Sequence, residues 1–344
     1  MHRIHIVNNA IFPDDRFLTG YESDMRHLFF SLFSILPQMC LGEEKCLENI
    51  RQLTCSEMGF SKAGEAYFSP DDTSILFQAV LNGQEEYQIY RMDLTAGVPC
   101  LVSTGKGNCT CAFFHPDGKK IIFASSHSDP NPIKKEKTHS GYKWDLTPYM
   151  NIYETNLDGA EMKALTSGAA YHAECAYSPD GMNIVYASNE NGSMNLYIMD
   201  ADGSNSCPLT HTEGVYNGGP FFSPDGSKII FRADRKEPDF LQIYMIDLQS
   251  GEETQLTDNQ AVNWAPYWHP DGDKIAFTTS LHGHDRYEIY LLNINTGLLH
   301  RITDRSGFDG LPVFSHDGKK LLWTSKRSKD QTCQIFIADF KKPF

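Results

Sequence analysis

Short runs of β-branched and aromatic residues alternate with turn-forming residues along most of the chain. Residues 121–123 read Ile-Ile-Phe, residues 184–186 read Ile-Val-Tyr, and residues 229–231 read Ile-Ile-Phe. Each run follows a Pro-Asp turn and is too short for a typical helix. The pattern therefore predicts buried strands, each forming a hairpin with the strand before its turn.

The turn belongs to a repeat in which an aromatic residue precedes Pro-Asp-Gly or a close variant. The six turn aspartates recur at intervals of 45 or 46 residues, with one interval of 63: Asp71, Asp117, Asp180, Asp225, Asp271 and Asp317. Pro presets φ, Asp stabilises the turn and Gly takes its left-handed corner. The longer interval places an insertion within residues 126–150.

Each repeat contains four strand-like segments, because a third strand such as residues 195–197 and a Leu-Thr segment such as residues 209–210 follow each hairpin. The last repeat lacks its fourth segment, and residues 50–54 form a fourth segment without a repeat of their own. Pairing the two would close a ring and remove the exposed sheet edges. The sequence therefore predicts an all-β, six-bladed propeller with four-stranded blades, in which the N-terminal strand completes the last blade.

These repeats resemble the WD40-like Pro-Asp repeats of TolB-type propellers over about residues 48–340. The segment Asn-Leu-Tyr-Ile-Met-Asp-Ala-Asp-Gly-Ser-Asn at residues 195–205 is the copy most similar to that consensus. The resemblance implies a propeller that binds protein or peptide partners, with envelope components among the candidates. TolB-type proteins also carry an α/β domain before the propeller, for which this chain leaves little room.

The net charge of the chain restricts the classes of partner that it can bind. The formal net charge is −14 and the pI about 5.3, so phosphate backbones would be repelled and a nucleic-acid partner is not expected.

The N-terminal region suggests export. Residues 28–36 form an apolar run that is too short to cross a bilayer but long enough for the core of a signal peptide. We expect an upstream extension at 1–24, a signal peptide at 25–42 and the propeller at 43–344. This predicts a periplasmic or otherwise exported monomer. The alternative is a cytoplasmic scaffold whose N-terminal segment stays attached.

The residues at the start of each innermost strand are the candidates for the channel mouth. They include carboxylates, amides, an imidazole and an indole: Glu65, Thr110, His172, Glu174, Asn217, Asn263, Trp264 and Asp309. Convergence of Glu65, Glu174 and Asp309 with the amides would suit Ca²⁺, which takes six to eight oxygen ligands. The same groups could instead bind a peptide or line a water-filled channel.

No nucleophile elbow, zinc-binding helix, phosphate loop or dinucleotide fingerprint occurs in the sequence. We therefore expect a non-enzymatic propeller without a cofactor that binds a protein or peptide through its channel face. The alternative is a metal-assisted lyase or hydrolase acting in the channel. The insertion, with Tyr142, Trp144 and Tyr149, is a second candidate contact surface.

Overall fold

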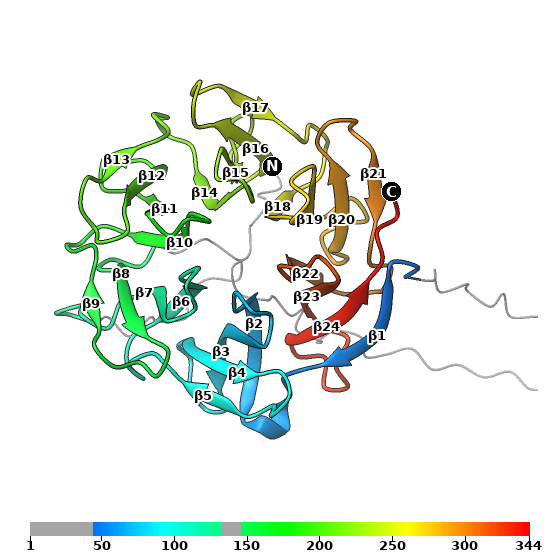
Figure 1. Cartoon of the computed structure of the whole chain (residues 1–344), viewed down its shortest axis with the longest axis horizontal. Helices are drawn as coiled ribbons and strands as arrows, with labels where there is room; N and C mark the ends of the chain where they lie inside the picture. Colours follow the sequence, from blue (N-terminus) through cyan, green and yellow to red (C-terminus); the bar gives the residue numbers. More distant parts are fainter. Residues whose placement is uncertain (1–43, 133–145) are drawn as a thin grey trace, which may run out of the picture.

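A computed structural model describes residues 44–132 and 146–344, and these residues form six four-stranded antiparallel sheets arranged in a ring (Figure 1). The prediction of an all-β six-bladed propeller is confirmed. Residues 1–43 and 133–145 lie outside the described part, and with them the predicted signal peptide, Tyr142 and Trp144. Within that part, no helix is both long and apolar enough to span a membrane.

The first three blades follow one another along the chain. Blade 1 contains β2 (Phe60–Phe68), β3 (Ser74–Leu81), β4 (Gln88–Asp93) and β5 (Pro99–Leu101). Blade 2 contains β6 (Cys109–Phe114), β7 (Lys120–Ser125), β8 (Asn151–Asn156) and β9 (Lys163–Ala164). Blade 3 contains β10 (His172–Tyr177), β11 (Asn183–Ser188), β12 (Asn195–Asp200) and β13 (Cys207–Pro208).

The other three blades complete the ring. Blade 4 contains β14 (Asn217–Phe222), β15 (Lys228–Ala233), β16 (Gln242–Asp247) and β17 (Glu253–Gln255). Blade 5 contains β18 (Asn263–Trp268), β19 (Lys274–Thr279), β20 (Glu288–Asn293) and β21 (Leu299–Arg301). Blade 6 contains β22 (Asp309–Phe314), β23 (Lys320–Ser325), β24 (Gln334–Phe340) and β1 (Leu47–Gln52), and a short 3-10 helix (Ser56–Met58) leads into blade 1.

The ring closes through β1, which pairs antiparallel with β24, with Leu47 opposite Phe340 and Gln52 opposite Phe336. Figure 1 shows the two strands side by side, blue against red. The strand lies slightly earlier than the predicted segment 50–54. Leu53 and Thr54 continue the contact with β24. The Leu53 amide donates to the Ile335 carbonyl (2.8 Å), and the Ile335 amide donates to the Thr54 hydroxyl (2.9 Å).

A buried hydroxyl explains why the fourth segment of each repeat ends in Leu-Thr. In every blade this hydroxyl accepts a hydrogen bond of 2.9 Å from the second amide of the third strand. The six acceptors are Ser103, Thr166, Thr210, Thr257, Thr303 and Thr54. Blade 1 has Ser103 in place of Thr, so the looser first copy of the motif keeps the same bond.

The hydrophobic core lies within and between the blades, and the apolar run of the second strand is buried in every blade. Ile75, Leu76 and Phe77 of β3 are fully buried, as are Ile229, Ile230 and Phe231 of β15. Such strands carry side chains on both faces against neighbouring sheets, which is why they read as continuous apolar runs rather than alternating ones.

Candidate binding site in the central channel

All six innermost strands carry a β-bulge at the same place. The pairing of each inner strand with its neighbour shifts three residues before the turn aromatic. The bulge residues have φ between 48° and 58°: Glu65, Cys111, Glu174, Gly219, Ala265 and Leu311. A bulge inserts one residue into a strand and re-aims the side chains around it. Its six-fold recurrence turns this ring of residues toward the channel.

A small chamber lies at the level of the bulges. Its volume is about 30 Å³, and its polar walls are Glu65, Glu174 and Arg232 together with Cys111. Such a volume holds roughly two water molecules. The chamber is therefore too small for a substrate or a peptide in this conformation.

Glu174 is fully engaged in the chamber wall. Its carboxylate accepts hydrogen bonds from Arg232 Nη2 (3.1 Å), from the Tyr216 hydroxyl (2.8 Å) and from the Gly219 amide. A Cβ added to Gly219 would collide with Arg232 Nη1. A side chain at Gly219 would therefore displace the guanidinium, which explains a glycine at this bulge.

Glu65 is buried but only partly bonded. Its Oε1 accepts a hydrogen bond of 3.4 Å from the Tyr67 hydroxyl, and its Oε2 has no hydrogen-bond partner within the described residues. Burial raises the pKa of Glu65 from 4.5 to about 7, and the nearby Glu174 carboxylate adds to the rise. Removing a carboxylate from water disfavours its charged form, so this group can take up a proton near neutral pH.

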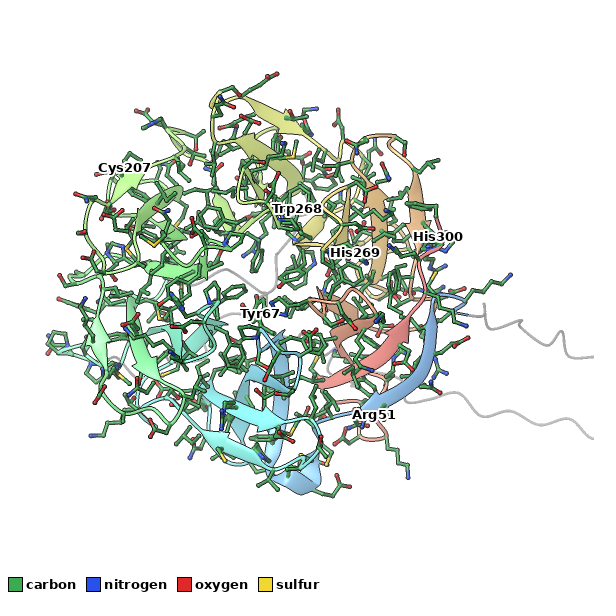
Figure 2. All side chains as sticks on the ribbon, in the orientation of Figure 1. Arg51, Tyr67, Cys207, Trp268, His269 and His300 are labelled. Carbon is green, nitrogen blue, oxygen red and sulfur yellow. The ribbon has the colours of Figure 1, made fainter. Side chains whose placement is uncertain are left out.

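Four aromatic rings fill the channel axis next to the chamber, and we call them the plug. They are Tyr67, Phe113, Phe221 and Tyr267, from blades 1, 2, 4 and 5, and their ring centroids lie 5.1 to 6.1 Å apart. Figure 2 shows Tyr67 close to the centre of the ring. Edge-on and tilted contacts at these distances are the favoured geometry of aromatic pairs. The plug therefore separates the chamber from the far end of the channel.

A larger cavity, which we call the cup, lies on the side of the Pro-Asp turns. Its volume is about 350 Å³, within the range of roughly 300–1,000 Å³ that is usual for ligand pockets. The plug contributes Phe113, Phe221 and Tyr267 to its wall, and the turns contribute prolines and aromatic residues from around the ring. These turn residues are Phe68, Pro70, Phe114, Pro116, Tyr177, Pro179, Phe222, Pro224, Trp268, Pro270 and Phe314.

The family is evident from comparison with known proteins. A family model of the TolB β-propeller domain matches residues 146–241, 208–287 and 237–342, which together span more than half of the chain. The chain belongs to the TolB β-propeller family. The resemblance inferred from the repeats is thereby confirmed.

Members and structural neighbours of this family differ in role. The Tol-Pal system protein TolB of Francisella tularensis subsp. mediasiatica is 29% identical over 197 residues, which is 56% of this chain and 40% of that protein. A solved structure ascribed to TolB of Agrobacterium tumefaciens has 23% identity and a TM-score of 0.58, covering 81% of this chain and 91% of that one. An oligogalacturonate lyase in complex with manganese has 21% identity and a TM-score of 0.56, covering 81% and 77%.

These similarities have clear limits. The chain matches the first curated relatives over 29% and 40% of their length. The two solved structures show a shared fold only. One fold can host several functions, and the function depends on the residues of the site.

Within this TolB-type propeller, the predicted mouth residues separate into two groups. Glu65 and Glu174 both line the chamber. His172, Asn217, Asn263 and Asp309 are the first residues of their strands and lie buried away from it. The bulge explains the difference. It inserts one residue three positions before the turn aromatic, so alternation counted back from the turn does not extend to the residue five positions before it.

The two asparagines connect neighbouring blades. Asn217 donates to the Met194 carbonyl (2.9 Å) and to the Thr212 hydroxyl, and Asn263 donates to Gln242 Oε1 (2.9 Å). Both are fully buried. Their amides therefore satisfy backbone and side-chain groups of the preceding blade, and they do not converge with the carboxylates.

Asp309 also lies apart from Glu65 and Glu174. It accepts hydrogen bonds from Trp323 Nε1 and Arg327 Nη2, both at 2.9 Å, and Arg327 also pairs with Glu44. Burial raises the pKa of Asp309 to about 6, against the opposing charge of Arg327. The predicted convergence of three carboxylates is therefore wrong: Asp309 joins blade 6 to the start of the propeller.

The donor set does not suit Ca²⁺. Within residues 44–132 and 146–344, no three His, Cys, Asp or Glu side chains are grouped so as to hold a metal ion. The chamber offers two carboxylates, and Arg232 already pairs with one of them. This falls well short of the oxygen shell that Ca²⁺ requires.

The three remaining candidates lie at or near the strand starts. Thr110 and Trp264 line neither the chamber nor the cup. Trp264 is buried against Tyr287 and Phe308 at ring distances of 6.4 and 6.2 Å. His172 is 3% exposed and its Nδ1 has no hydrogen-bond partner among the described residues.

The sequence analysis missed Arg232, the plug and the cup. The residue directly before the turn aromatic is itself aromatic in four repeats, and this was the signal for the plug. Arg232 lies on a second strand, β15, and nothing in its local sequence indicates that it reaches the channel.

Proposed function

We propose that this TolB-type propeller is a non-catalytic binding module that holds a protein partner at the turn side of its channel. The observation that carries the proposal is the cup, an open apolar cavity of about 350 Å³ walled by aromatic rings and prolines. Rigid aromatic surfaces of this kind are typical of sites that anchor a partner's side chain.

The polar groups of the cup support binding rather than catalysis. Ser178, Ser223 and Ser315 donate their hydroxyl protons to the turn aspartates at 2.5 to 2.7 Å. His316 lies 2.9 Å from Asp72. A serine nucleophile needs an adjacent base to take its proton, and these hydroxyls are committed to turns. The rival hypothesis, a metal-assisted lyase or hydrolase, gains no support from these residues.

We further propose that the protein is an exported monomer of the cell envelope that needs no cofactor. Support comes from the signal-like segment at residues 25–42 and from the relative named as part of a Tol-Pal system. Finding the mature N-terminus at or near Glu43 in an envelope fraction would agree with this. An uncleaved chain in the cytoplasm would reject export.

Site-specific cross-linking tests the binding proposal. A photo-reactive amino acid replaces the half-buried Phe222 in the cup and, as a control, the exposed Cys207 on the outer strand β13. We expect one discrete adduct from Phe222 and none of the same mass from Cys207. The captured protein, once identified and purified, should bind the wild-type propeller. Identical adducts from both positions, or none from Phe222, would contradict a partner in the cup.

A further inference from the structure

The rim of the cup is unevenly charged. Three of the six turn aspartates, and Asp72 beside a fourth, have a cationic or imidazole neighbour: Asp271 pairs with Lys274 and Lys342, Asp317 with Lys319, Asp117 with His115, and Asp72 with His316. The lysine pairs offset charge on the turns of blades 5 and 6, and the imidazoles lie against carboxylates of blades 1 and 2. Asp71 of blade 1 itself accepts hydrogen bonds from Ser69 and Thr73 and has no ion pair within the described residues.

On blades 3 and 4, which follow one another in the ring, neither turn has a cationic or imidazole neighbour of this kind within the described residues. Asp180 accepts hydrogen bonds from Ser178 Oγ (2.6 Å) and the Met182 amide (3.0 Å), and Asp225 accepts them from Ser223 Oγ (2.5 Å) and from Ser227. Neither forms an ion pair within the described residues. Lys228, whose charge also acts on Asp225, pairs with Asp247 at 3.7 Å.

These two carboxylates lie beside the wall of the cup. Ser178 and Ser223, which donate to them, line the cup together with Pro179 and Pro224. Each carboxylate is therefore one hydrogen bond away from the cavity. The turn hydrogen bonds lower the pKa of both groups, that of Asp225 to about 2, so both stay charged at neutral pH.

The wall itself has few hydrogen-bond donors. Proline has no amide hydrogen, and the rings offer apolar faces. Such a surface discriminates by shape and apolar contact, and an adjacent fixed charge gives orientation and partner choice.

We propose that the cup binds one aromatic or large apolar side chain of an extended peptide segment, and that a positively charged residue next to it lies against Asp180 and Asp225. This rests on the proposed function and specifies the chemistry of the partner. The apolar cavity and two carboxylates without an ion pair lie side by side. A segment that carries an apolar and a positively charged side chain can therefore contact both at once.

Defined tripeptides test the proposal on the full propeller. The probes are acetyl-Lys-Trp-Lys-amide, acetyl-Glu-Trp-Glu-amide and acetyl-Lys-Ala-Lys-amide, titrated in low salt while chemical shifts of the protein are followed. We expect the first to bind at least about tenfold more tightly than the other two, a difference of about 1.4 kcal/mol. Raising the salt to about 0.5 M should reduce the difference, because rim charges are exposed and screened.

Charge variants identify the carboxylates. Asp180→Asn with Asp225→Asn keeps the Oδ1 acceptor of each turn and removes the charge. This pair should lower the affinity for the Lys-Trp-Lys peptide about tenfold. The matched control, Asp158→Asn with Asp202→Asn, makes the same change in two outer turns, where each aspartate accepts from a backbone amide. The control should bind like the wild type.

The outcomes separate this inference from the proposed function. Equal binding of the Lys-Trp-Lys and Glu-Trp-Glu peptides, or equal loss in both pairs of variants, would overturn the charged rim. Equal binding of the Lys-Ala-Lys peptide would overturn the apolar anchor. If a protein cross-links at Phe222 but binds the Asp180→Asn/Asp225→Asn variant normally, the binding module stands and this inference fails.

Discussion

At the scale of single residues, the channel contains two carboxylates that differ in their ion pairing and hydrogen bonding. Glu174 forms an ion pair with Arg232 and accepts a hydrogen bond from the Tyr216 hydroxyl, whereas one oxygen of Glu65 has no hydrogen-bond partner in the described structure. A buried charge is costly unless it is paired and hydrogen-bonded. We therefore expect the two sites to respond in opposite ways to loss of charge.

Replacing Glu65 by Gln should remove a pH dependence of stability. Because the pKa of Glu65 is raised to about 7 in the folded state, its contribution to stability is present below about pH 4.5 and is lost as the pH rises through about 7. Glu65→Gln should equal the wild type at pH 4 and exceed its free energy of unfolding at pH 8 by about 3 kcal/mol. Urea unfolding at both pH values measures this, with Glu252→Gln on an exposed turn as control. A constant difference at both pH values would refute the assignment.

Replacing Arg232 by Met should strongly destabilise the fold, because it leaves the Glu174 carboxylate buried and unpaired. Loss of one partner of a buried pair costs about 3–5 kcal/mol. The double variant Arg232→Met/Glu174→Gln should recover much of this loss, as a double-mutant cycle by urea unfolding would show. Additive losses would mean that the two groups are not coupled.

At the scale of elements, two structural features recur in all six blades, one at the inner strand and one at the fourth strand. The inner-strand bulge directs Glu65, Cys111 and Glu174 toward the channel, although non-glycine residues rarely adopt positive φ. The fourth strand ends in a hydroxyl that satisfies a buried amide of the third strand. Neither device depends on a single residue type, which allows six unequal repeats to form similar blades.

The hydroxyl device gives a test in blade 4. Thr257→Val keeps the shape of the side chain but leaves the Ile243 amide without its acceptor. An unsatisfied buried donor costs about 1–3 kcal/mol. Thermal or urea unfolding should show this loss, whereas Thr254→Val, at an exposed position of the neighbouring β17, should leave the stability nearly unchanged. A similar effect of both changes would argue that valine alone is responsible.

At the scale of the whole molecule, closure of the ring brings together the residues of the plug and the cup. The plug combines residues of four blades, and the cup draws on all six. β1 completes blade 6 and also covers the edge of β24. The geometry of the channel therefore depends on a strand more than 280 residues away in sequence from its partner.

A chain that begins at residue 54 should be much less stable than one that begins at residue 44. Without β1, the backbone groups of β24 form an unpaired edge that favours association. We expect a lower melting temperature and oligomers in gel filtration for the shorter chain, and a monomer for the longer one. Equal stability of the two chains would show that β1 contributes little to closure.

Chelation tests the proposal that no cofactor is involved. Since no three potential ligands are grouped in the described residues, we expect EDTA to leave the melting temperature and the binding of the Lys-Trp-Lys peptide unchanged. Ca²⁺ or Mn²⁺ added back should also have no effect. A rise in melting temperature that saturates with either ion would restore the metal hypothesis.

The sequence by itself determined the repeat, the turns, the number of blades and the closing strand, because these depend on local turn chemistry and on a period that recurs along the chain. It named Glu65 and Glu174, which line the chamber, together with His172, Asn217, Asn263 and Asp309, which are buried away from it. The prediction assumed that side chains alternate strictly along each inner strand, and a bulge breaks this alternation. The six bulge residues share no residue type, so the sequence gives no signal for the bulge. Only the tertiary structure decided that aromatic rings close the axis and that the open cavity lies on the turn side. These features arise where six strands, each about 45 residues from the next in most repeats, meet around one axis.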